Sequence, residues 1–268
     1  MLSGTKLVLP ILASFVILST SAALAGAPNG FAGSLSGDYL KPSCSGCGGL
    51  DAWGISGSGA YGLGMNDLAV QGDAGYHRLS GSGVNVDLWN VGGSAFWAGF
   101  MGRLGANLSY ASLDTSGANG HVTGYGGFGE YYPTQAITVG LNAGGFSAGG
   151  SISGLGSASS TGSYVGGGAT GYLVPDFAAS GLINYISISG VHFTTYGGGL
   201  EYLFSESLPI SIYGGYSTTE VSGGGGHINQ WSVGFKFYTN GNGVTLVDRH
   251  RNGTLGPVGI GNALQFAF

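Results

Sequence analysis

Charge is what this sequence has least of. Asp, Glu, Lys and Arg make up 7% of the 268 residues, against ~25% in an ordinary soluble domain. A soluble domain needs charged side chains on its surface, and a nucleic-acid-binding protein needs an excess of basic ones. Only 7 residues are Lys or Arg, against 12 that are Asp or Glu. These shortages argue against a soluble domain and against nucleic acid as a partner.

Long apolar runs and helical patterns are also missing. After residue 25 no run of 18 or more apolar residues occurs, which excludes a helical membrane protein. The three- and four-residue apolar spacing of amphipathic helices is absent as well. Proline is too scarce, at 7 residues, for collagen, and a mean hydropathy of +0.26 does not suit a disordered chain. What remains is a β-rich chain, with 58 glycines, whose outer surface does not mainly face water.

The first 25 residues have the organisation of a secretory signal. Lys6 precedes an apolar run from Leu7 to Leu18 that is too short to span a bilayer, and Ala23-Leu-Ala25 forms a small-x-small cleavage site. We therefore expect a signal peptide over 1–25, a main domain over 26–239 and a tail over 240–268.

A repeat of aromatic residues predicts the number of strands. Segments with period-2 alternation recur, and an aromatic residue returns about every 36 residues, the length of one β-hairpin. Further aromatics follow at even offsets of six or eight, on the same strand face and nearly one bilayer apart. We expect the set to form an aromatic girdle whose main members are Trp53, Trp89, Trp97, Tyr125, Tyr164, Tyr172, Tyr196 and Trp231.

Six such repeats predict an all-β fold, an antiparallel transmembrane β-barrel of about twelve strands, with ten as the alternative. Longer connections are expected at 41–51, 79–84, 112–119, 147–160 and 220–226. The strands are predicted at 30–40, 52–63, 67–78, 85–98, 101–111, 120–132, 135–146, 161–173, 176–187, 191–204, 207–219 and 227–239.

Strand parity separates a lipid-facing set from a lumen-facing set. Outward positions carry mostly Leu, Ile, Val and aromatics, whereas inward positions carry Gly, Ser, Asn and nearly all charges; Val165 and Leu182 depart from this pattern. The spacing predicts a lumen charge cluster near the periplasmic end, made of Arg103, Glu130, Glu201 and Lys236. Its role is either ion selectivity or simply mutual neutralisation of interior charges.

Few motifs suggest chemistry. Cys44 and Cys47 lie in the first predicted extracellular loop, where an oxidising compartment favours a local disulfide. Gly57-Ser-Gly-Ala-Tyr-Gly62 matches a dinucleotide-binding pattern but has no helix after it, so we take it as chance. No catalytic residue, metal site or cofactor is expected, although the many serines leave a lipid-acting enzyme open.

The sequence also resembles a known group of proteins. A terminal aromatic, Phe268, after alternating apolar residues is similar to the targeting signal of Gram-negative outer-membrane proteins. The stretches Leu88–Trp97, Tyr125–Glu130, Glu201–Glu206, Tyr213–Tyr216 and Phe237–Gly243 followed by Leu246–Arg249 look like small outer-membrane barrels of alphaproteobacteria, often labelled porin family. This resemblance implies residence in the outer membrane, contact with its lipid and lipopolysaccharide, and recognition of Phe268 by the barrel-assembly machinery.

Three functions remain open at this point. The favoured one is a porin-like passive channel for small hydrophilic solutes, motivated by the small polar residues predicted to face inward. The alternatives are a plugged structural or surface-interaction barrel without transport and, third, a barrel enzyme that acts on lipids. The predicted tail, 240–268, is expected either to hang in the periplasm or to form a short closing strand.

Overall fold

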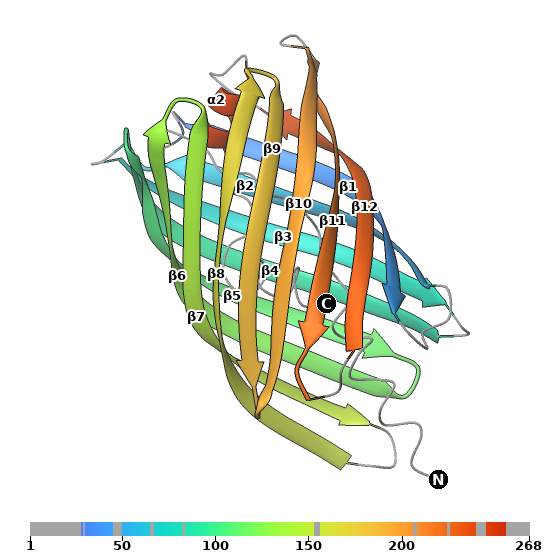
Figure 1. The fold of residues 1–268 in the computed structure, drawn as a ribbon. Coiled ribbons are helices and arrows are strands. Elements are labelled where there is room, and N and C mark those ends of the chain that lie inside the picture. Colours follow the sequence, from blue (N-terminus) through green and yellow to red (C-terminus); the bar gives the residue numbers. More distant parts are fainter. Residues whose placement is uncertain are drawn as a thin grey trace.

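The computed structural model describes residues 28, 30–44, 50–64, 67–81, 84–152, 156–205, 208–223, 226–239 and 245–255. Within them, twelve antiparallel strands form one closed barrel, in which each strand pairs with its neighbours in the chain and β1 pairs with β12 (Figure 1). The predicted twelve-stranded barrel is thus confirmed. The strands are β1 (Phe31–Cys44), β2 (Leu50–Gly62), β3 (Leu68–Gly81), β4 (Val84–Gly99), β5 (Gly102–Thr115), β6 (Ala118–Thr134), β7 (Ile137–Ile152), β8 (Gly156–Val174), β9 (Phe177–Ile188), β10 (Val191–Ser205), β11 (Leu208–Val221) and β12 (Gly226–Thr239).

Alternation of side chains decides which face of each strand is buried. In β12 buried and exposed residues alternate almost without interruption from Ile228 to Tyr238. Apolar side chains on the outer face are left open, as at Leu104 and Leu108, which are 67% and 68% exposed. The buried core therefore lies inside the barrel, and the apolar outer surface has no protein partner within the described part of the chain.

The strands are longer than predicted. The connections expected at 112–119 and 147–160 are largely strand, because β5 and β6 pair as far as Thr115 and Ala118. Likewise β7 and β8 pair as far as Ile152 and Gly156. Glycine- and serine-rich sequence is typical of loops, but backbone pairing in a hairpin needs no particular side chain. The hairpins β5–β6 and β7–β8 consequently extend well beyond their predicted ends.

Two of the predicted girdle residues face the lumen instead of the lipid. Tyr164 and Tyr172 are only 3% and 6% exposed and point into the barrel, whereas their neighbours Val165 and Leu173 are 53% and 70% exposed. The period of about 36 residues is irregular at this repeat, and a displacement of one residue exchanges the two faces of a strand. In β8 the odd-numbered residues face outward. Val165, which departs from the predicted pattern, is one of them.

The described part of the tail forms a helix. Helix α2 (Leu246–Asn252) begins at Thr245, whose hydroxyl accepts a hydrogen bond from the Asp248 amide. The barrel closes between β1 and β12 without help from the tail, so neither expected form of 240–268, a free tail or a closing strand, fits residues 245–255. Among the described residues no helix is long and apolar enough to cross a membrane.

Some predictions fall on the part of the chain that is not described. The signal peptide, Cys47 and Phe268 all lie outside the described residues. Cys44, the last residue of β1, is disulfide-bonded.

Candidate functional site: the plugged mouth of the barrel

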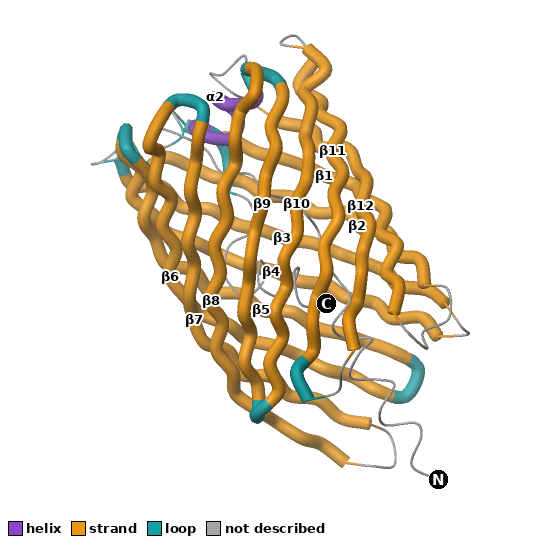
Figure 2. The backbone as a smooth tube through the Cα atoms, viewed as in Figure 1, coloured by secondary structure: helices purple, strands orange, loops and turns teal. Residues whose placement is uncertain are grey.

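Helix α2 closes one end of the barrel. We call this end the terminal mouth, because β1 begins there and β12 ends there; the turns at 100–101, 135–136 and 175–176 surround it. Figure 2 shows the helix at this end, between the walls formed by the strands. We call residues 245–255 the plug. They bury Leu246, Arg249, His250, Arg251, Thr254 and Leu255 to 7% exposure or less.

His250 anchors the plug at the barrel wall. Its Nδ1 lies 3.2 Å from the Tyr172 hydroxyl, and its Nε2 lies 3.0 Å from the Tyr238 hydroxyl and 3.2 Å from a carboxylate oxygen of Glu201. Burial lowers the pKa of His250, which the Glu201 carboxylate opposes. A neutral ring protonated on Nε2 satisfies these contacts: Nε2 donates to the carboxylate and Nδ1 accepts from Tyr172.

Arg251 fixes the helix to a second part of the wall. Its guanidinium donates to the carbonyl oxygens of Thr134 and Ile137, at 3.0 and 3.4 Å, on either side of the β6–β7 turn. It also lies 5.7 Å from the ring centre of Tyr132 and 5.1 Å from that of Tyr172. The cation is therefore held by hydrogen bonds and by cation–π attraction together.

The end of the plug is tied to further strands. Gln71 on β3 exchanges two hydrogen bonds with the Leu255 backbone, at 2.7 and 3.1 Å. The hydroxyls of Ser34 on β1 and Thr254 lie 3.0 Å apart. Near the start of the helix, the Leu246 amide donates to the Pro175 carbonyl at 2.9 Å. Because these partners come from strands around the whole barrel, the plug spans the mouth rather than lying along one wall.

The four predicted lumen charges meet at this mouth. Arg103 stands opposite Glu130 in the β5–β6 ladder and donates to the carbonyls of Arg251 and Gly253 in the plug, at 2.6 and 3.3 Å. Glu130 accepts from the Tyr132 hydroxyl at 2.9 Å. On the other side Glu201 contacts His250, and the Lys236 ammonium lies 4.9 Å from the ring centre of Tyr238. The selectivity role of this cluster stays a prediction, but two of its members bind the plug directly.

Above the plug the lumen has two layers of different character. A polar layer follows first; its buried members include Ser36, Asp38, His77, Ser94, Asn107, Asn184 and Ser232. Toward the distal mouth, the end opposite the plug, the lining becomes apolar on β1–β9, whereas the buried residues near the distal ends of β10–β12 are polar: Thr195, Ser217, Thr219 and Gln230. Two clusters form the apolar part, one of Leu40, Leu50, Ala52, Leu79 and Val86 and the other of Ala111, Phe146, Tyr164 and Ile186.

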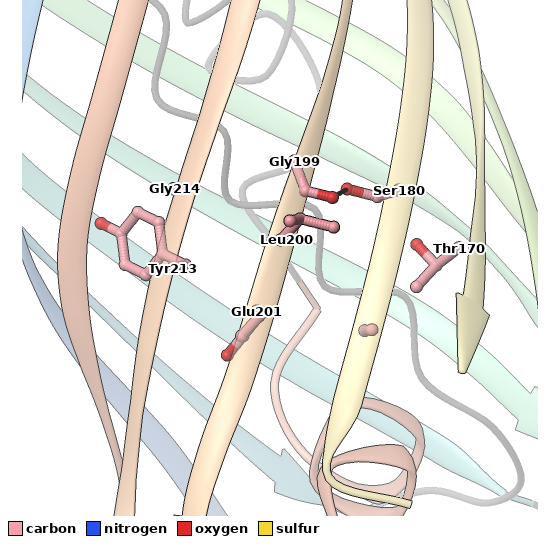
Figure 3. Close-up of a pocket in the computed structure, with 8 residues that line it drawn as sticks. Thr170, Ser180, Gly199, Leu200, Glu201, Tyr213 and Gly214 are labelled. Carbon is pink, nitrogen blue, oxygen red and sulfur yellow. Dashed lines mark hydrogen bonds between the residues drawn. The ribbon is translucent and has the colours of Figure 1, made fainter. Parts of the chain in front are cut away.

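A small pocket remains in the wall between the plug and the polar layer. Its volume of about 10 Å³ leaves room for about one water molecule, and its polar lining includes Thr170, Ser180, Glu201 and Tyr213 (Figure 3). Elsewhere in the lumen, most inward side chains of the described strands are buried. Among the described residues no group of three or more His, Cys, Asp or Glu side chains is placed to hold a metal ion.

The outer surface carries the expected aromatic and apolar belt. The remaining girdle residues all point outward with exposures of 39–64%: Trp53, Trp89, Trp97, Tyr125, Tyr196 and Trp231. Between the aromatic rows lie exposed aliphatic side chains such as Ile55, Val91 and Leu141. A belt of this kind suits contact with lipid acyl chains, with aromatics at the two interfaces.

Comparison with known proteins identifies the fold. The sequence matches no family model and no curated protein. The β domain of the Bordetella autotransporter BrkA is similar in structure, with a TM-score of 0.53 at 13% identity, over 78% of this chain and 99% of that one. The translocator domain of the autotransporter NalP from Neisseria meningitidis gives 0.51 at 16% identity, over 78% and 88%. The KdgM porin gives 0.50 at 14% identity, over 76% and 99%.

The chain has the fold of an outer-membrane β-barrel. Together with the lipid-facing belt, this fold places it in the cell outer membrane. At such identities the likeness concerns architecture alone, and the resemblance to one alphaproteobacterial group stays a prediction.

The sequence does not predict the plug. A free tail or a closing strand is expected for 240–268, and charged residues such as Asp248–Arg251 in a short tail are usually exposed. Two signals were available: Thr245 and Asp248 have the spacing of a helix cap, and Leu246 and Leu255 at the two ends of the segment need burial. Neither signal says where the helix binds.

Proposed function

We propose that this chain is an outer-membrane channel that its own C-terminal plug holds closed at the periplasmic mouth. The observation that supports this most is the plug itself, seated in the mouth by contacts to strands around the barrel. The terminal mouth is assigned to the periplasm, because both ends of the barrel strand series lie there, as in outer-membrane barrels with an even number of strands. Small hydrophilic solutes are the expected cargo, since a polar layer lies directly above the plug.

The proposal includes partners and excludes catalysis. The aromatic and aliphatic belt contacts lipid and lipopolysaccharide, and Phe268 addresses the chain to the barrel-assembly machinery. The chain acts without an enzymatic step or cofactor. In the open state, Arg103, Glu130, Glu201 and Lys236 surround the vacated mouth, where they contribute to ion preference.

A second candidate is a permanently sealed barrel with a structural role. The apolar residues near the distal mouth favour it, because Leu40, Leu79 and Val86 are at most 3% exposed and offer a hydrophilic solute no polar contact on their side of the lumen. The two candidates differ in one respect: whether solutes pass once the plug is free to move.

A reversible lock on the plug separates the candidates. The Ser34 and Thr254 hydroxyls are 3.0 Å apart, so the double variant Ser34→Cys/Thr254→Cys is placed to form a disulfide between β1 and the plug. In liposomes, swelling in a small sugar should be absent for the oxidised variant and should return to the wild-type rate after dithiothreitol. Wild-type protein treated with the same reductant controls for the disulfide at Cys44. If the reduced variant and the wild type both admit no solute while folded, the channel proposal is wrong and the sealed barrel stands.

A further inference from the structure

One row of the barrel ladder brings three functional side chains to the middle of the lumen. His77 on β3 pairs with Gly54 on β2, which pairs with Asp38 on β1; Asp38 then pairs with Gly234 on β12, and Gly234 with Tyr213 on β11. We call these five residues the Asp38 row. It lies about halfway along β1, with the apolar residues Leu40 and Leu79 two positions further toward the distal mouth.

Two glycines make the row possible. A Cβ at Gly54 would lie 1.8 Å from Cδ2 of His77, and a Cβ at Gly234 would lie 2.6 Å from the Tyr213 hydroxyl oxygen. The imidazole and the phenol therefore lie flat over the glycines of the intervening strands and approach Asp38 from both sides. His77 Nε2 comes within 3.8 Å of an Asp38 carboxylate oxygen.

Asp38 is the unusual member of the row. Its side chain is fully buried, and neither carboxylate oxygen has a hydrogen-bond partner in the described part of the chain. A buried carboxylate without hydrogen bonds is expensive unless a cation or protein donors compensate it. The Ser36 and Ser56 hydroxyls beneath it bond to each other at 2.7 Å rather than to Asp38.

The pocket of Figure 3 extends to the Asp38 row, because Tyr213 is one of the residues that line it.

We propose that the Asp38 row is a binding site for a small cation and makes the channel cation-selective. Carboxylate and hydroxyl oxygens are the ligands that alkali and alkaline-earth cations prefer, and acidic side chains in a narrow lumen attract cations and repel anions. Asp38 supplies the charge, and the Tyr213 hydroxyl supplies a neutral oxygen. The selectivity part of this proposal rests on the proposed channel function; the binding part does not.

Ion selectivity is measured in planar bilayers across a KCl gradient. In an Arg251→Ala background, which weakens the plug, Asp38→Asn should lower the K⁺ over Cl⁻ permeability ratio by about tenfold, the size expected of one unit charge beside a water-filled bore. Asp114→Asn is the matched control, because Asp114 lies on the outer face near the end of β5, and it should leave the ratio unchanged. A heat-modifiability gel confirms that each variant folds. An unchanged ratio in folded, conducting Asp38→Asn would overturn the selectivity.

Rubidium binding tests the site without conduction. Crystals of the full chain soaked in RbCl should show an anomalous peak beside Asp38, and crystals of Asp38→Asn should show none. If the Arg251→Ala barrel conducts nothing but the peak is present, the channel proposal fails and the site stands. If the barrel conducts and the peak is absent or persists in Asp38→Asn, the cation site is wrong.

Discussion

At the residue scale, the plug is held mainly by buried polar and charged side chains. Arg249, His250 and Arg251 are 7%, 0% and 3% exposed, and each contacts an aromatic ring of the wall. A buried charged group is weak evidence for stability, because its loss of hydration offsets much of the attraction that it gains. Contacts of this kind suit a segment that leaves and returns, since the same groups are well solvated in water.

Arg251 offers the clearest test at this scale. Arg251→Ala removes hydrogen bonds to two backbone carbonyls and two ring contacts. Hydrogen bonds to a charged group contribute about 1.5–3 kcal/mol, so the open probability in single-channel recordings should rise by roughly tenfold or more. Arg78→Ala is the matched control, because Arg78 is 41% exposed and pairs with Asp87 near the distal end. Equal gating in both variants would contradict the role of Arg251.

At the scale of elements, the strands and the plug differ in how far the sequence predicts them. The number of strands, and for most strands which residues face outward, can be predicted from period-2 alternation. The reason is that lipid favours apolar side chains on one face of a strand, whereas the lumen accepts small and polar ones on the other. The prediction for β8 has the wrong face outward, because its aromatics, Tyr164 and Tyr172, are inward and its outward face is partly glycine. The distal ends of β5–β8 are not predicted, because their Gly and Ser residues do not alternate between apolar and polar. The plug is not predicted, because its burial depends on partners such as Tyr172 and Arg103, which are distant in the sequence.

The facing direction of β8 is directly measurable. With the native cysteines replaced by serine, a spin label at Val165→Cys should be highly accessible to oxygen dissolved in the bilayer. A label at the adjacent Tyr164→Cys should be shielded from both oxygen and a water-soluble relaxation agent, because Tyr164 lies in a buried cluster. Reversed accessibilities at the two positions would contradict the outward position of Val165.

At the scale of the whole molecule, the barrel is a lipid-facing shell around a layered interior. The apolar outer belt is predictable, since charge is nearly absent from outward positions. The position of the plug across one mouth is not, because the sequence indicates which residues face inward but not how the tail folds back between them. Figure 1 shows the front and rear strands running in clearly different directions, an arrangement that composition alone does not specify.

Conductance of a barrel that ends at Thr239 tests the central claim most directly. The β1–β12 ladder is complete without the tail, so this shortened chain should refold into vesicles and shift on a heat-modifiability gel as the full chain does. In the same planar bilayer, the full chain should be closed for most of the recording, and the shortened chain should remain open. A shortened barrel that is folded and as tightly closed as the full chain would contradict the account.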